Sequence, residues 1–345
     1  MRERGKFVSA SVGLAATVAM LGTWASALPL EDRLSFDFYP ENQKEIVTVT
    51  MENDVVSNAD RHYTSGLRVA RLLKNGGEPD WMRRVLRRIA GDESPLYRYE
   101  VAFGQQLYTP EDLLAEERIE GDRPYAGWIY ASIGRVERRG RVVDQVELSL
   151  GVVGPAALGE ETQKLVHEFF ASKDPQGWDN QLENEPTLQL YGQRNWWLLR
   201  GARTGPVQWD LVPYAGGAIG NVHLYANGGV TVSVGVGDRE RFGTPRLGML
   251  LPGNGYFTQG DGMTWQLFAS AGGAAIGRNL FLDGNTFRSE TSTVEKERFV
   301  SEAQIGLQFI WGNNRLSFVH VYRSKEFERQ ERAESYGALS YSLAY

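Results

Sequence analysis

Residues 336–345, YGALSYSLAY, show most clearly how this chain folds. Leu339 and Tyr341 alternate with alanine and serine along this segment, and the final residue, Tyr345, is aromatic. A strict period of two indicates a β-strand with one apolar face and one small or polar face. Strands of this kind, with aromatic residues at their ends, are typical of a membrane-spanning β-barrel.

Two more segments repeat the alternation. They are FVSEAQIGLQFIW at residues 299–311 and DQVELSLGVVG at residues 144–154. A soluble β-sandwich also alternates in this way, so the pattern alone leaves both architectures open. The 39 glycines, together with 9 Trp, 15 Tyr and 15 Phe, favour the membrane barrel, which needs many turns and many interfacial aromatics.

The first 27 residues have the composition of a secretory signal peptide. Three basic residues precede an apolar stretch at residues 7–21, and small residues follow at Ala25 and Ala27. We therefore expect an exported chain of residues 28–345, which contains no second apolar run near the roughly 20 residues that a membrane-spanning helix needs. The chain has no cysteine for disulfides, and its net charge of −6 argues against a nucleic-acid partner.

Alternation and turn residues together predict a transmembrane antiparallel barrel of about twelve strands. The predicted strands cover residues 44–53, 65–74, 98–107, 126–137, 142–153, 186–197, 207–219, 228–238, 264–275, 299–311, 314–323 and 336–345. An even number of strands places both termini in the periplasm, and the connections after odd-numbered strands are then extracellular. Two connections predicted to be periplasmic, 74–97 and 239–263, are longer than such turns usually are.

The first extracellular connection is rich in oxygen donors. Asn53, Asp54 and Thr64 offer the hard oxygen ligands that Ca²⁺ prefers. An ion held there could polarise an ester carbonyl while a nearby histidine activates water. The alternative is that Asn53 and Asp54 only start a turn, where both residue types are common.

The third extracellular connection, residues 154–186, contains a predicted short helix. Glu160 and Glu161 lie in its early turns, where carboxylates favour a helix N-terminus. Gln163 and His167 are four residues apart and so share one face of this helix. A helix over the barrel rim with these two polar side chains is a candidate wall of a cleft.

The other histidines have weaker surroundings. His320 falls inside a predicted strand and His223 beyond the end of another, away from the polar groups named above. No Gly-X-Ser-X-Gly motif marks a nucleophilic serine, so the sequence favours chemistry by activated water.

Four motifs, in order along the chain, carry a resemblance to a known family. They are ENDVVSNADRHYTSGL at 52–67, QLYTP with GDRPYAGW between 106 and 128, GVVGPAALGEETQKLVH at 151–167, and GWDNQLENEP at 177–186. Together they resemble the outer-membrane lipid A deacylase family of LpxR type over essentially the whole of residues 28–345. The resemblance implies a twelve-stranded barrel with a Ca²⁺-dependent extracellular site that removes the 3′-linked acyloxyacyl group of lipid A.

The resemblance also implies roles for individual residues. Asn53, Asp54 and Thr64 match the metal site, Gln163 matches a polar helix residue, and His167 matches the base that activates water. Supporting positions around them are Tyr63, Asp174, Asp179 and Glu185.

One position departs from the family pattern, which has a glutamate six residues after the histidine. This chain has Lys173 there. The acidic role is either absent or is taken by Asp174, Glu168 or Glu185, and activity on the same acyl position depends on which of these holds.

Two other functions remain open at this point. One is an outer-membrane phospholipase that acts on glycerophospholipid. The other is a non-catalytic barrel, such as a narrow channel or an adhesin. In each case we expect a monomer in the outer membrane, and the deacylase would meet lipopolysaccharide in the outer leaflet.

Overall fold

The computed structural model describes residues 44–53, 62–94, 96–170, 174–200, 207–236, 255–288 and 294–345. The predicted signal peptide, residues 1–27, lies outside these ranges. The strands are β1 (Ile46–Asn53), β2 (His62–Leu72), β3 (Leu96–Thr109), β4 (Ala126–Arg139), β5 (Val142–Val153), β6 (Glu185–Trp196), β7 (Leu199–Arg200), β8 (Val207–Gly220), β9 (His223–Val236), β10 (Gly260–Asn279), β11 (Phe299–Gly312), β12 (Asn314–Arg323) and β13 (Glu334–Ala344). The helices are α2 (Asp80–Ala90), α3 (Gly159–Phe170) and α4 (Leu280–Asp283), with single 3-10 turns η3 (Pro155–Ala157) and η4 (Trp178–Asn180).

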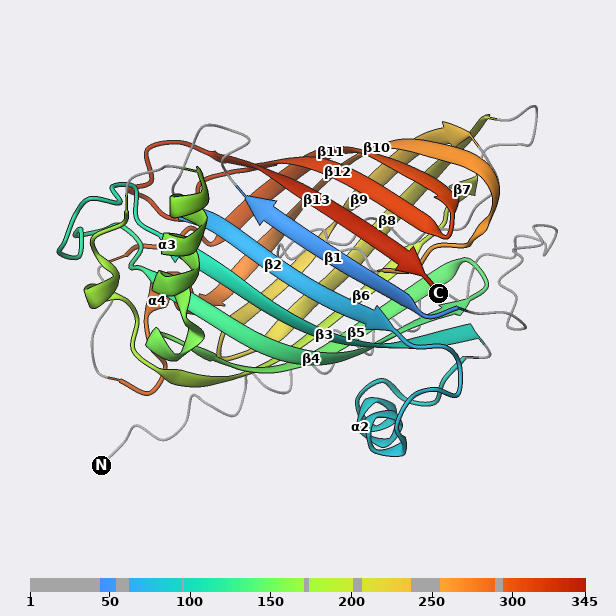
Figure 1. The fold of residues 1–345 in the computed structure, drawn as a ribbon, viewed down its shortest axis with the longest axis horizontal. Helices are drawn as coiled ribbons and strands as arrows, with labels where there is room; N and C mark the ends of the chain where they lie inside the picture. Colours follow the sequence, from blue (N-terminus) through green and yellow to red (C-terminus); the bar gives the residue numbers. More distant parts are fainter. Residues whose placement is uncertain are drawn as a thin grey trace. The chain divides into compact units, whose positions relative to one another are not determined.

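These strands form one closed antiparallel barrel (Figure 1). Each strand pairs with its neighbours in sequence except that β6 and β7 do not pair with each other. β1 pairs with β13, and β6 pairs with β8 to close the sheet. The two-residue β7 pairs with β8 beyond the end of β6, so the barrel itself has twelve strands. The predicted fold is confirmed. Two predicted strands, 142–153 and 314–323, match the structure to the residue, and the largest difference is at the start of β9, predicted at residue 228 and observed at His223.

The period of two separates the two faces of the barrel wall. On β13, Leu339, Tyr341 and Leu343 are between 40 and 50% exposed, whereas Ser340 and Ser342 are at most 3% exposed. The apolar residues therefore face outward and the small polar residues face the lumen. This is the arrangement that a barrel surrounded by lipid requires.

Charged side chains inside the barrel are paired. Arg68 contacts Glu100 at 2.6 Å and Glu147 at 3.1 Å, which links β2, β3 and β5 across the interior. Arg323 of β12 contacts Glu302 of β11 at 2.9 Å. Buried charges are tolerated when each finds an opposite charge, so these pairs allow ionisable groups to fill the lumen.

Antiparallel pairing sorts the connections between the two ends of the barrel. Strands β1, β3 and β5 finish at one end of the barrel, which we call the α3 end, and α2 lies at the other end with the C-terminus (Figure 1). This agrees with the predicted parity of the connections. No helix in the described ranges is both long and apolar enough to cross a membrane.

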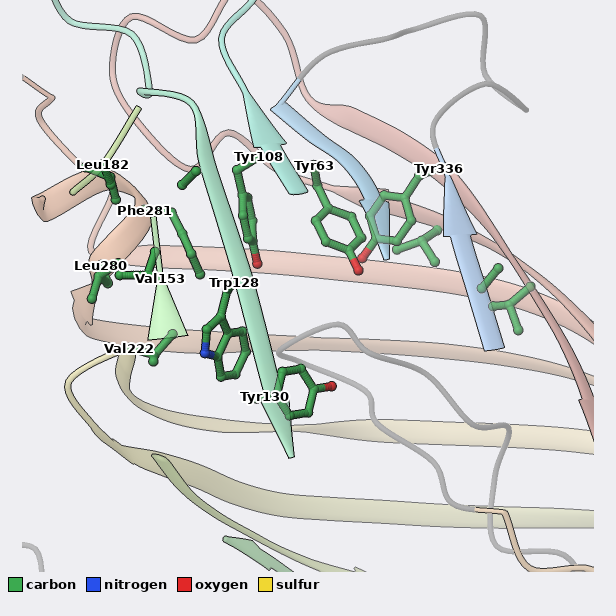
Figure 2. Close-up of a cluster of buried hydrophobic side chains, with 14 of the residues drawn as sticks. Tyr63, Tyr108, Trp128, Tyr130, Val153, Leu182, Val222, Leu280, Phe281 and Tyr336 are labelled. Carbon is green, nitrogen blue, oxygen red and sulfur yellow. The ribbon is translucent and has the colours of Figure 1, made fainter. Parts of the chain in front are cut away.

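An aromatic cluster fills the lumen near the α3 end (Figure 2). The rings of Tyr108 and Phe281 stack with centroids 3.8 Å apart, and Trp128 stacks on Tyr130 at 4.4 Å. Tyr63 joins the cluster from β2. Offset and edge contacts between such rings stabilise the packing beyond the area that they bury. The cluster therefore supports the part of the wall against which α3 lies.

Candidate functional site

Helix α3 and the turn before it lie on the outer face of the barrel wall. Leu107 shares the outward row of β3 with Phe103, but Leu107 is 2% exposed and Phe103 is 55% exposed. Gln105, in the same row, donates from Nε2 to the carbonyl oxygen of Ala157 at 2.7 Å. The connection that carries α3 therefore covers the outward face of β3 near the end of the strand.

Two glycines allow the helix to start directly on strand β4. A Cβ atom on Gly127 would lie 3.2 Å from the Cα atom of Gly159, the first residue of α3. A Cβ atom on Gly159 would lie 2.6 Å from Cη2 of Trp178. A side chain at Gly159 would overlap Trp178 and one at Gly127 would crowd the start of α3, so the backbones of helix and wall approach each other closely here.

The face of α3 that carries Gln163 and His167 is buried. Gln163 is 2% exposed and His167 is 4% exposed, whereas Leu165 on another face of the same helix is 68% exposed. The indole N–H of Trp178 donates to Oε1 of Gln163 at 2.8 Å. This donor fixes which amide atom faces Trp178, so the Gln163 NH₂ group points elsewhere. Its nitrogen is buried and finds no acceptor among the residues that the structure describes.

Trp178 is the side chain that links the GWDNQLENEP motif to α3. It is buried, and its ring centroid lies 4.9 Å from that of Tyr125. We predicted Asp179 in a supporting position, and the structure leaves its side chain exposed. Asn180 donates to the carbonyl oxygen of Glu116 at 2.7 Å, in the β3–β4 connection. A tryptophan within an otherwise polar loop was the signal that sequence reasoning missed.

Asn53 lies in the same row of the wall as the residues under α3. It pairs with Ser65 of β2, Ser65 pairs with Leu107 of β3, and Leu107 pairs with Gly127 of β4. On β1 the alternate residues Val49 and Met51 are exposed, and Asn53 continues this outward row. The strand register thus places Asn53 at the same level of the outer face as Gly127, the residue of β4 on which α3 starts.

Two predicted metal-site positions, and the position that departs from the family pattern, cannot be placed in this way. Asp54, Lys173 and the side chain of Thr64 lie outside the described residues. Asp174 is described and exposed. Among the described residues no cluster of three or more His, Cys, Asp or Glu side chains could hold a metal ion. The described oxygen donor of the predicted calcium site is therefore the Asn53 amide.

Two predicted supporting residues point to other parts of the barrel. Tyr63 faces the lumen and donates to Oε2 of Glu52 at 2.9 Å, on the side of the wall opposite to Asn53. Glu185 accepts hydrogen bonds from Asn221 at 2.8 Å and from the backbone N–H of Thr286 at 2.6 Å. Glu185 therefore holds the β8–β9 and β10–β11 connections together.

His223 has closer neighbours than the sequence suggested. It begins β9 and is 6% exposed, with its ring 5.6 Å from that of Phe281 and 6.5 Å from that of Trp128. It therefore belongs to the aromatic cluster in the lumen, on the other side of the wall from α3.

The GDRPYAGW motif orders the β3–β4 connection. The Asp122 carboxylate accepts hydrogen bonds from the backbone N–H groups of Glu111 and Arg123, each at 2.7 Å. Burial raises the pKa of Asp122, although both N–H groups favour its ionised form. Arg123 then donates to Glu326 at 2.7 Å, which ties this connection to the one between β12 and β13. The motif therefore holds the loop against which Trp178 packs.

Comparison with known proteins identifies the family of this chain. Over residues 10–345 the sequence matches the family described as outer membrane protein LpxR. The structure is similar to LpxR from Salmonella typhimurium, with a TM-score of 0.71 and 19% sequence identity over 87% of this chain and 100% of that chain. The β domain of the Bordetella autotransporter BrkA gives a TM-score of 0.40 at 9% identity, over 88% of this chain and 99% of that chain. No curated protein sequence matches the chain. Because the family match extends over nearly the whole sequence, the chain belongs to the LpxR family of outer membrane proteins.

Proposed function

We propose that this protein is an outer-membrane lipid A deacylase that hydrolyses the 3′-linked acyloxyacyl ester of lipid A on the extracellular side. The observation that carries the proposal is the buried pair Gln163 and His167, on a helix that lies on the outward face of the barrel wall. A polar pair in this place can meet a lipid in the outer leaflet, which the barrel lumen could not do. Membership of the LpxR family supports the same reaction.

The dimensions of strand and helix support a site shared by Asn53 and His167. Neighbouring strands are about 4.8 Å apart, so β1 and β4 are separated by about 14 Å. Gly159 and His167 are eight residues apart, and eight residues of α-helix advance about 12 Å. Figure 1 shows α3 running crosswise to the strands. A helix that starts over β4 and crosses toward β1 carries its histidine close to the outward end of β1.

In the proposed reaction His167 acts as a general base. It takes a proton from a water molecule, whose oxygen attacks the carbonyl carbon of the ester. As the bond between the acyl carbon and the sugar oxygen breaks, the protonated imidazole gives its proton to that oxygen, so the sugar leaves with a free hydroxyl. The buried NH₂ group of Gln163 is a donor for the water or for an ester oxygen, and Trp178 keeps that amide in one orientation.

The donor set of the first motif fits calcium. Asn53, Asp54 and Thr64 would hold the ion, because amide, carboxylate and hydroxyl oxygens are the ligands that Ca²⁺ prefers. When bound, the ion supplies a positive charge that polarises the ester carbonyl. Among the described candidates for the missing glutamate, Glu185 already accepts hydrogen bonds from the β8–β9 and β10–β11 connections, so we assign the acidic role to Asp174 or Glu168.

The wall beside α3 suits a substrate with acyl chains. Leu67 and Phe103, in the outward rows of β2 and β3, are 44 and 55% exposed. When the acyl chains of a lipid lie on this surface, the ester bond at their head is at the membrane boundary, next to α3. In a channel the functional polar side chains line the lumen, whereas Gln163 and His167 lie outside it. Their position therefore favours an enzyme that acts on a lipid.

One experiment separates the three candidate functions. Purified protein is incubated with lipid A or with glycerophospholipid, in Ca²⁺ or in EDTA, and the mass of each lipid is followed beside His167→Ala. We expect lipid A to lose the 3′-linked acyloxyacyl mass only in Ca²⁺ and only with the unaltered chain. Loss of fatty acid from phospholipid alone would replace this proposal with a phospholipase, and unchanged masses throughout would leave a non-catalytic barrel.

A further inference from the structure

Helix α2 lies at the end of the barrel opposite α3 (Figure 1) and packs on outward residues of the wall. Met82 and Leu86 are fully buried and pack with Tyr99, an outward residue of β3. Partly buried outward residues of the neighbouring strands, Ile133 of β4 and Val146 of β5, pack against the same group. The helix therefore covers three strands on the face that meets lipid elsewhere.

Charged residues of the wall hold α2 in place. Arg135 of β4 is 2% exposed and donates to the carbonyl oxygens of Ala90 and Gly91, at 3.0 and 2.9 Å, where the helix ends. Glu137, two residues later in the same outward row, is 4% exposed and accepts from the backbone N–H of Ser94 at 3.1 Å. Cations satisfy the carbonyls at a helix C-terminus. The helix is thus fixed to the wall and does not swing freely from its connection.

The solvent side of α2 carries unpaired positive charge beside apolar side chains. Arg83 and Arg87 are neutralised by Glu93 and Asp92. Arg84 and Arg88 are exposed, and neither has an acidic partner in the part of the chain that the structure describes.

Apolar residues flank these arginines. Trp81 is 53% exposed and Ile89 is 38% exposed. Arginines with long apolar stems beside exposed Trp and Ile are the composition of a helix that lies in a membrane interface.

The position of α2 along the strand matches the edge of the apolar band. On β3 the outward row is covered by α2 at Tyr99 and by the α3 connection at Leu107, and Phe103 between them is exposed. The eight residues from Tyr99 to Leu107 extend about 27 Å along the strand. With the usual tilt of barrel strands this corresponds to about 20 Å across the membrane, close to the height of the lipid-facing band. The two helices therefore lie at its two boundaries.

We propose that α2 is an interfacial docking surface for anionic phospholipid headgroups, in which Arg84 and Arg88 bind the phosphates and Trp81 and Ile89 enter the acyl boundary. With α3 on the extracellular side, α2 meets the periplasmic leaflet. Its continuity with the lipid-facing wall favours a lipid over a soluble periplasmic partner. The surface is separate from the deacylation site and does not depend on it.

The absence of cysteine from the sequence allows a single-site probe. The full chain with Ile89→Cys, labelled with bimane, is reconstituted in phosphatidylcholine vesicles. These contain spin-labelled phosphatidylglycerol or spin-labelled phosphatidylcholine at equal mole fraction. We expect both spin-labelled lipids to quench the probe. We also expect the anionic lipid to be enriched around the probe by about fivefold for each arginine. Arg84→Glu combined with Arg88→Glu should abolish the enrichment and leave general quenching in place.

Controls separate this result from a folding defect. Arg332→Glu changes an exposed arginine at the α3 end and should leave the enrichment unchanged. In the protein with all its arginines intact, a higher salt concentration should also reduce the enrichment, because salt screens the attraction between arginine and phosphate. Equal quenching by the two lipids would overturn the proposal. Quenching by neither would also overturn it, and would show that α2 faces an aqueous partner such as a periplasmic protein.

Discussion

At the scale of single residues, the site depends on how one face of α3 is held. Gln163 and His167 are buried although both are polar, and Trp178 fixes the amide of Gln163 through its indole N–H. The sequence predicted the pair from its i, i+4 spacing, because helical periodicity is local. It did not predict Trp178, because a partner 15 residues away depends on how the following loop folds back.

Replacing His167 by glutamine tests the general base. His167→Gln keeps a polar side chain of similar size but cannot take up the proton from water. We expect the rate of lipid A deacylation to fall about 10²- to 10⁴-fold, with little change in thermal stability. Leu165→Ala, on an exposed face of the same helix, is the matched control and should leave the rate unchanged. A His167→Gln variant with full activity would remove His167 from the mechanism.

At the scale of elements, the contact between α3 and the wall depends on Gly127 and Gly159. The sequence predicted a helix here from its first-turn carboxylates and its spacing. Whether that helix would lie against the outside of the wall or over the lumen depended on strand register, which alternation alone does not fix. The alternation pattern predicts only a long connection at 74–97, whereas the structure has α2 there. Asp80 in the first turn, basic residues in the last turn and Gly91 after it are ordinary helix signals.

Adding a methyl group at the start of α3 should move the helix off the wall. In Gly159→Ala the new Cβ would lie 2.6 Å from Trp178, so the helix or the indole must shift. We expect a loss of about 1–3 kcal/mol in the free energy of unfolding and a parallel loss of deacylation rate. Gly192→Ala on β6, whose nearest atom would be 3.9 Å away, is the control and should change neither. Equal effects of the two substitutions would argue against a close contact at Gly159.

Docking of α2 should weaken in acid. Burial opposes the ionisation of Glu93, but hydrogen bonds from Arg83 and Tyr99 outweigh it and lower the pKa of Glu93 from 4.5 to about 2. Because this pKa is lower in the folded protein, the contact stabilises the docked helix above pH 4.5 and is lost as the pH falls toward 2. The protection of residues 80–90 against amide hydrogen exchange, relative to the intrinsic exchange rate at each pH, should therefore fall in that window. Glu93→Gln should exchange faster at neutral pH and respond less to acid; the same acid response as the unaltered chain would contradict this account.

At the scale of the whole molecule, the barrel wall has a polar inner face and an apolar outer face, and the β6–β8 pair closes it. Its strands could be predicted from sequence because each carries its own alternation and turn residues. The pairing of charges across the lumen could not, since Arg68 and Glu147 are 79 positions apart and meet only when the sheet closes. His223 was misplaced for the same reason, because its aromatic neighbours come from distant strands.

Removing one lumen charge should destabilise the closed barrel. Arg323 is 3% exposed and contacts Glu302 at 2.9 Å, so Arg323→Ala leaves a buried carboxylate without its main cation. We expect the free energy of unfolding in urea to fall by about 3–5 kcal/mol. Arg329→Ala, at a side chain that is 66% exposed, should cost at most about 1 kcal/mol. A small effect at Arg323 would show that water enters the lumen at that level.

The central claim is that water, activated on the buried face of α3, cleaves an acyl ester of lipid A. The most direct test is to incubate the protein with lipid A in water enriched in oxygen-18 and to determine the mass of the released acid. We predict one heavy oxygen in the carboxylate of the released acid, and lipid A that is lighter by the 3′-linked acyloxyacyl group. Acid released without the heavy oxygen, or lipid A of unchanged mass, would contradict the account.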